Sequence, residues 1–198
     1  AQQEAIDYYQ LAVRLADDET SIDDINVVRY FICYLCYASG DSYRAALMGD
    51  FVARRYPDSA GARDSATIAM ASYAQIYGQK NVTATAVFAE ADTDKNKQLS
   101  TEELQAVGLD GGADKSGNGT VSLEELAESF SRYEVDRIVA SAEYIVEKWP
   151  EQPAAQDALV TLVPFMINSA QLDRAQEYIE KMPESSPRRG DSELKTGQ

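Results

Sequence analysis

Apolar residues recur with the period of an α-helix along most of this 198-residue chain, and one glycine-rich segment interrupts them. Between Ser21 and Gly40 they are spaced by three, four and three residues, which places them on one helix face. The same pattern predicts helices over residues 3–15, 42–56, 60–77, 122–149, 154–169 and 172–182. Six of the eleven glycines lie from Gly78 to Gly119. The chain is therefore expected to be all-α, with a structurally distinct segment in its middle.

Proline spacing suggests that this middle segment interrupts a repeat. Helix ends are indicated by Gly40, Pro57, Gly78 and Pro150. Pro150 and Pro187 are 37 residues apart, the length of one helical hairpin, whereas Pro57 and Pro150 are 93 apart. The excess of 56 residues matches the glycine-rich segment in size. We therefore expect an insertion between the two helices of one hairpin, where few buried contacts cross.

The residues twelve positions before three of the prolines are small or apolar: Ala45, Ile138 and Ala175. This arrangement resembles the tetratricopeptide repeat (TPR), in which a small residue of the second helix packs on the first and a proline closes the unit. The family's tryptophan and glycine–tyrosine positions hold Arg29, Cys33 and Cys36. The resemblance implies a right-handed helical-hairpin array, an α-solenoid, over residues 1–79 and 132–187. A generic helical-hairpin array is the alternative, and residues 188–198 form a tail or start a further repeat.

The insertion, residues 80–131, contains two twelve-residue segments with oxygen-bearing side chains at matching positions. Residues 92–103 and 114–125 both resemble the calcium-binding loop of the EF-hand family. Calcium takes about 6–8 oxygen ligands, so side chains, a position-7 carbonyl and a bidentate glutamate at position 12 must converge from a curled loop. The resemblance implies these ligand positions: Asp92, Asp94, Asn96, Gln98, Ser100 and Glu103 in the first loop, and Asp114, Ser116, Asn118, Thr120, Ser122 and Glu125 in the second.

Other positions of the two loops agree with this assignment or depart from it. Leu99 and Val121, at position 8, are expected to form a short antiparallel bridge between the loops. At position 6 the backbone needs a positive φ, which Gly119 adopts freely but which costs Lys97 about 1 kcal/mol. A short helix from about residue 83 should enter the first loop. Ten residues separate the loops, too few for a full helix entering the second.

Two other interpretations of these loops are possible. They could be acidic turns with coincidental oxygens, but two in tandem with the same spacing favour a cation site. Magnesium is disfavoured because it prefers fewer protein ligands in strict octahedral geometry. The sequence therefore predicts two calcium ions.

Charge and composition exclude several functions. The formal charge of −15 would repel a phosphate backbone, so a nucleic-acid partner is not expected. The chain has no histidine, which removes Ser-His and Cys-His catalysis. Cys33 and Cys36 form a C-x-x-C, but they lie inside a helical pattern and are expected in the core rather than in a redox site. No apolar run is long enough to span a bilayer.

These features predict a calcium-binding helical-repeat scaffold with a protein or peptide partner, and not an enzyme. The alternative is a purely structural, calcium-stapled segment of a larger protein that regulates no partner. The acidic composition and the loops suit a bacterial extracytoplasmic setting, although the compartment itself is not readable from the sequence.

Overall fold

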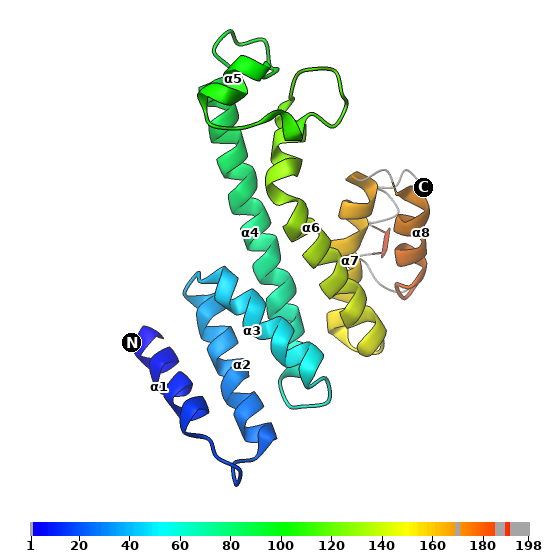
Figure 1. The fold of residues 1–198 in the computed structure, drawn as a ribbon. Coiled ribbons are helices and arrows are strands. Elements are labelled where there is room, and N and C mark those ends of the chain that lie inside the picture. Colours follow the sequence, from blue (N-terminus) through cyan, green and yellow to red (C-terminus); the bar gives the residue numbers. More distant parts are fainter. Residues whose placement is uncertain (1, 169–170, 185–188, 191–198) are drawn as a thin grey trace. The chain divides into compact units, whose positions relative to one another are not determined.

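The computed structural model describes residues 2–168, 171–184 and 189–190 (Figure 1). Within them the chain is all-helical and contains no strand. The α-helices are α1 (Gln2–Leu15), α2 (Ile22–Ala38), α3 (Ser42–Arg55), α4 (Ala62–Ala91), α5 (Thr101–Ala106), α6 (Leu123–Lys148), α7 (Pro153–Asn168) and α8 (Leu172–Glu180), with a 3-10 turn, η1, at Gly111–Ala113. No helix in these residues is both long and apolar enough to cross a membrane.

The chain divides into two compact units. Unit 1 comprises residues 1–73 and 137–198, and unit 2 comprises residues 74–136. The predicted insertion, residues 80–131, lies inside unit 2. Most of the predicted tail, residues 188–198, lies outside the described residues, which include only Arg189 and Gly190 of it.

In unit 1, α2 packs against both α1 and α3. Their shared core contains four fully buried side chains: Ile6, Ile32, Cys36 and Ala45. Cys33 is also buried, its thiol lies 3.3 Å from the Ala45 carbonyl oxygen, and both cysteines are free. Burial raises the pKa of the Cys33 thiol to about 12, so it is not a thiolate at neutral pH. The prediction that the C-x-x-C pair fills a core is confirmed.

A polar network joins the two chain segments of unit 1. It lies where the chain leaves unit 1 after residue 73 and returns to it at residue 137. Tyr73 donates a hydrogen bond to Asp50 Oδ2 at 2.9 Å, and Arg137 pairs with the same carboxylate. The Arg137 guanidinium also lies over the Tyr73 ring, 5.3 Å from its centroid. Tyr144 donates to the Ala53 carbonyl at 2.7 Å. Residues 73 and 137, which flank segment 74–136 on either side, are therefore in direct contact.

Unit 2 contains the second part of α4, the two loops, α5, η1 and the first part of α6. Its core consists of eight buried residues: Ala84, Phe88, Ala91, Leu99, Leu104, Ala113, Val121 and Leu126. Lys80 on α4 binds Glu134 on α6 at 2.8 Å, and the Glu134 side chain is only 2% exposed. A buried carboxylate needs such a partner, so this pair holds the two helices in register.

Two helix predictions meet different outcomes here. The unbroken helix predicted over 122–149 is confirmed by α6. The expected stop at Gly78, followed by a separate short helix from about residue 83, is wrong, because α4 continues to Ala91. Gly78 is exposed and does not have a positive φ. A helical glycine costs about 1 kcal/mol relative to alanine, which the burial of Ala84, Phe88 and Ala91 beyond it can offset.

Candidate metal centre

The two predicted loops lie next to each other in unit 2 and are joined through their centres. The first links α4 to α5, and the second links η1 to α6. The Leu99 N–H donates to the Val121 carbonyl at 2.8 Å, and the Val121 N–H donates back at 2.9 Å. Both side chains are completely buried. The predicted antiparallel bridge is therefore confirmed, and it anchors each loop to the hydrophobic core.

Three carboxylates converge in the first loop. Oxygen atoms of Asp92, Asp94 and Glu103 all lie within 4.8 Å of one another. One oxygen of Asp92, Oδ2, accepts the Lys97 N–H at 3.1 Å. The other, Oδ1, is buried and has no hydrogen-bond partner. A buried carboxylate oxygen without a donor is costly, and the Asp92 carboxylate also lies close to two further negative charges.

Glu103 is held in place from two sides. Its Oε2 accepts the Ser100 N–H at 3.0 Å, and its Oε1 accepts the Thr93 N–H and hydroxyl at 2.9 Å each. These hydrogen bonds, led by the one from the Ser100 backbone, lower the pKa of Glu103 to about 2. Ser100 in turn caps α5 and completes a capping box with Glu103. The glutamate is thus ionised and oriented at neutral pH.

Side chains of the first loop curl its backbone. Asp94 Oδ1 accepts the Asn96 N–H at 3.0 Å, and Asn96 Oδ1 accepts the Gln98 N–H at 2.7 Å. Lys97 has a φ of 67°, so the predicted positive φ at position 6 is confirmed. Lys95 adopts one as well, at 59°, which the sequence pattern did not indicate. Non-glycine residues rarely adopt a positive φ, so two of them in one loop indicate that the surrounding contacts hold the backbone in this conformation.

The second loop repeats this arrangement with fewer charges. Asp114 accepts the N–H groups of Gly117 and Gly119, each at 2.8 Å, and the bond from Gly119 contributes most to lowering its pKa. The Ser116 hydroxyl also lies 3.2 Å from Asp114 Oδ1. Both oxygens of Asp114 therefore have donors, unlike those of Asp92.

Glu125 occupies the position in the second loop that Glu103 has in the first. It accepts the Ser122 N–H at 2.9 Å and the Ser116 N–H at 3.0 Å. These bonds, the one from Ser122 first, lower its pKa to about 2. Asn118 Oδ1 accepts the Thr120 N–H at 2.9 Å. No α-helix enters this loop in the described chain: residues 111–113 form only the 3-10 turn, as the short spacing predicted.

A side-chain contact between the loops was not predicted. The Thr120 hydroxyl lies 3.0 Å from Gln98 Oε1 and 2.8 Å from Asn118 Oδ1. Gln98 and Thr120 both hold position 7, next to the bridging residues. The sequence gives one signal for this contact, which is that both position-7 side chains are polar. The loop assignment uses only the backbone carbonyls at this position, so it does not predict a contact between the side chains.

This donor set fits a hard divalent cation. The predicted positions offer oxygen atoms, the position-12 glutamates are ionised at neutral pH, and Asp92 has an oxygen without a donor. Calcium prefers carboxylate and carbonyl oxygens in flexible loops of this kind. Asp92, Asp94, Asn96 and Glu103 would hold the ion in the first loop through side chains, and Gln98 through its carbonyl.

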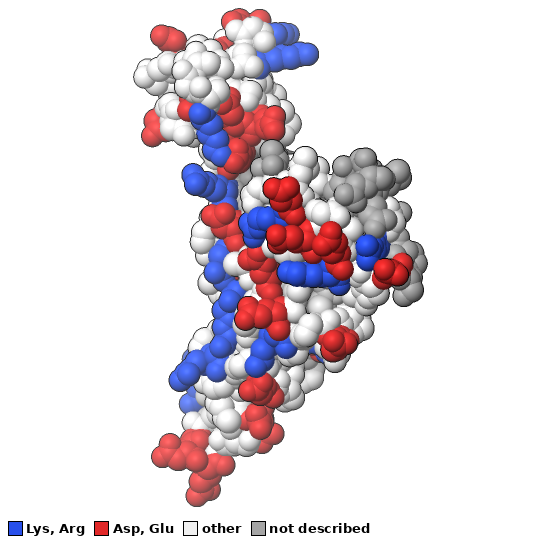
Figure 2. Space-filling model, turned by 90° about the vertical axis from the view of Figure 1, so that its right-hand side faces the viewer, with Lys and Arg blue, Asp and Glu red and all other residues white. Residues whose placement is uncertain are grey.

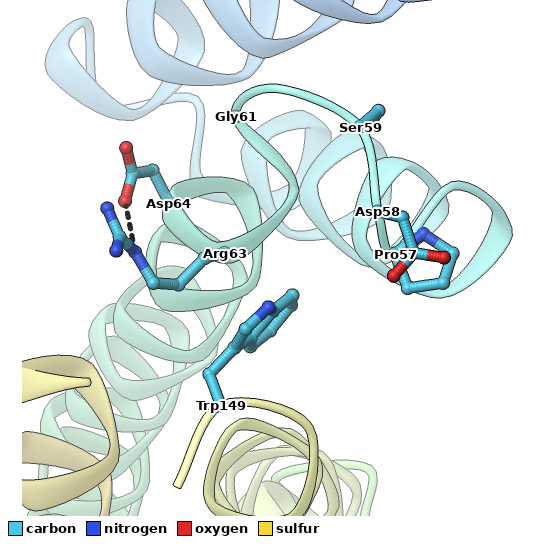
Figure 3. Close-up of a pocket in the computed structure, with 7 residues that line it drawn as sticks. All are labelled: Pro57, Asp58, Ser59, Gly61, Arg63, Asp64 and Trp149. Atoms are coloured by element: carbon cyan, nitrogen blue, oxygen red, sulfur yellow. Dashed lines mark hydrogen bonds and ion pairs between the residues drawn. The ribbon is translucent and has the colours of Figure 1, made fainter. Parts of the chain in front are cut away.

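A small cavity in unit 1 lacks comparable chemistry. It measures about 320 Å³ and lies where Trp149 faces the turn of residues 57–61 (Figure 3). Its charged groups are already paired, because Arg63 binds Asp64 at 3.0 Å and Gln152 at 2.9 Å. Asp58 is paired with Lys148 at 3.1 Å. The charged side chains described at this cavity are therefore all paired with other residues.

Comparisons with protein-family models, curated proteins and solved structures give no match for this chain. Its function is therefore inferred from the residues and geometry of the two loops and of the helices around them.

Proposed function

We propose that this protein binds two calcium ions in its tandem EF-hand-like loops and acts as a TPR-like scaffold for protein interaction. The observation that carries the calcium proposal is the environment of Asp92. Its Oδ1 is buried without a donor, and one oxygen of its carboxylate lies within 4.8 Å of carboxylate oxygens of Asp94 and Glu103. A bound cation would satisfy that oxygen and remove the repulsion among the three charges.

The second loop supports the same assignment less strongly. It contributes only two carboxylates, Asp114 and Glu125, against three in the first loop. We therefore expect the first loop to bind calcium more tightly than the second, although Lys97 has a strained φ there. The Leu99–Val121 bridge and the Gln98–Thr120 contact link the two sites.

The scaffold proposal rests on unit 1. Ala45, Ile138 and Ala175 are fully buried, which is what the repeat interpretation requires of the positions twelve residues before each proline. The contact between Tyr73 and Arg137 supports an insertion, because the chain returns to the place from which it left. A generic helical-hairpin array with the same insertion remains the alternative fold description.

Calorimetric titration with calcium tests the metal proposal. We expect two sites in the unaltered chain, loss of one in Glu103→Gln and loss of the other in Glu125→Gln, since each removes the bidentate anionic ligand. Glu102→Gln and Glu124→Gln are matched controls, because these exposed neighbours carry the same charge and should leave both sites intact. Two-site binding that survives in the Glu103→Gln, Glu125→Gln double variant would refute the assignment.

The purely structural alternative makes a different prediction. If calcium only staples the insertion, the protein should bind two ions and yet bind no peptide under any condition. A scaffold should instead bind a partner segment through unit 1.

A further inference from the structure

We propose that a groove in unit 1 binds a short partner segment that combines basic and aliphatic side chains. This inference rests on the scaffold part of the proposed function and not on calcium binding. The groove has a volume of about 770 Å³, within the range of ligand pockets. It is formed by the end of α6, the first half of α7 and the end of α8, all in unit 1.

The inner wall of the groove is apolar. Leu159 and Tyr178 are 3% and 5% exposed, and Ala155 in the first turn of α7 is also buried. Pro150 and Pro183 border the groove and have no N–H to offer a ligand. An aliphatic side chain inserted against this wall would be removed from water, at a gain of roughly 25 cal/mol per Å² of apolar surface.

Acidic side chains line one side of the groove at intervals of four residues. Glu143, the first, is already paired with Arg174 and Tyr178. Glu147 and Glu151 are exposed and have no hydrogen-bond or ion-pair partner in the described part of the chain. Two free carboxylates at the edge of an apolar wall favour a ligand whose cations flank an aliphatic side chain.

The aromatic wall of the groove already carries two cations of the chain. Lys181 Nζ lies over the Tyr178 ring, 5.2 Å from its centroid, and the Arg174 guanidinium also lies over this ring, 5.9 Å from its centroid. Because the chain's own cations already lie over this ring, the cations of a ligand are expected beside Glu147 and Glu151 instead. Figure 2 shows acidic side chains gathered on the face that carries α7 and α8, with basic ones between them. The net charge of −15 further disfavours acidic peptides and nucleic acids as occupants.

Fluorescence anisotropy with the full chain tests the proposal. The probes are three fluorescein-labelled octapeptides: alternating Leu-Lys, alternating Leu-Glu and alternating Ser-Lys. We expect saturable binding of the Leu-Lys peptide alone. Glu147→Gln combined with Glu151→Gln should weaken it by about fivefold, the scale expected for two exposed charge pairs. The matched control is Asp18→Asn with Glu19→Gln, two exposed residues outside the groove, which should leave the affinity unchanged.

Several results would overturn the proposal. Equal binding of the Leu-Lys and Ser-Lys peptides, or an unchanged affinity in the Glu147→Gln, Glu151→Gln variant, would show that charge alone attracts the peptide elsewhere. Absence of binding would also reject it, as would a concentration-dependent dimer that the peptide dissociates, which would assign the groove to a second copy. Tighter binding in Arg188→Gln, Arg189→Gln would assign it to the chain's own basic segment.

A second measurement separates this inference from the calcium proposal. The titrations are repeated with calcium and with excess chelator, and amide chemical shifts are followed at Val146 and Leu159. Because no groove residue lies in unit 2, we expect the same affinity and the same shifted amides in both conditions. Peptide binding without calcium binding would refute the metal proposal alone, and calcium binding without peptide binding would refute the groove alone.

Discussion

Replacement of Asp92 by asparagine should change the stability of the protein in opposite directions with and without calcium. Asp92 has one buried oxygen without a donor and lies within 4.8 Å of the Asp94 carboxylate, measured between their oxygens. Asparagine has nearly the same shape and keeps an oxygen that can accept the Lys97 N–H. Asp92→Asn therefore removes charge repulsion from the metal-free loop and removes an anionic ligand from the calcium-bound one.

The two effects can be estimated from the structure. Two unit charges 4.8 Å apart repel by about 0.9 kcal/mol even at the dielectric constant of water. The metal-free variant should therefore be more stable by about 1 kcal/mol, which raises the melting temperature of a chain this long by roughly 2–4 °C. With calcium at about 100 times its Kd, the unaltered loop gains about 2.7 kcal/mol that the variant lacks. In calcium the variant should therefore be less stable, by about 2 kcal/mol after the relief of repulsion is included.

Thermal unfolding followed by circular dichroism, in chelator and in saturating calcium, measures both effects. We expect the variant to have the higher melting temperature in chelator and the lower melting temperature in calcium. Glu90→Gln is the control, since this exposed residue of α4 carries the same charge close to the loop in sequence. If Asp92→Asn lowered the melting temperature in chelator as well, Asp92 would be a structural hydrogen-bonding group and the argument from its unpaired oxygen would be refuted.

Three further predictions concern the same loops. Lys97→Gly should tighten the first site by up to about fivefold in calorimetry, because glycine adopts the observed φ of 67° without strain; unchanged affinity would mean that backbone entropy cancels the gain. Gln98→Ala and Thr120→Val should each reduce cooperativity between the sites, and a double-mutant cycle should show that the effects are not additive; additive effects would contradict coupling through this contact. Because the pKa values of Glu103 and Glu125 are lowered to about 2 in the folded protein, their contribution to metal-free stability is present above about pH 4.5 and should be lost as the pH falls toward 2. Carboxyl carbon NMR titration checks this, and midpoints near 4.5 would contradict the hydrogen bonding described here.

Local sequence patterns were sufficient for most helices of this protein. The unbroken α6 follows from a segment without glycine or proline, and the end of α2 follows from Gly40, which has a φ of 81°. The pattern failed at Gly78, because a glycine weakens a helix by only about 1 kcal/mol. Packing in the core of unit 2, where Ala84 and Phe88 are buried, is enough to carry the helix through it.

Loop chemistry was also largely local. The positive φ of Lys97 and the Leu99–Val121 bridge follow from positions within the twelve-residue loops, and the missing entry helix before Asp114 follows from the ten residues between the loops. A residue's position within such a loop restricts its backbone and the direction of its side chain, so the spacing alone predicts which oxygens face inward.

The sequence by itself determined the helical periodicity, the helix ends at most glycines and prolines, and the positions of the oxygen-bearing side chains. These depend on interactions between residues close together in the chain. Only the tertiary structure decided that Asp92 Oδ1 is left without a donor, that Tyr73 contacts Arg137, and that an acidic groove forms beside α8. The first depends on how the folded loop places donors around one carboxylate, which residue spacing does not specify. The other two depend on separate helices, and no pattern along the chain specifies which side chains meet when these pack.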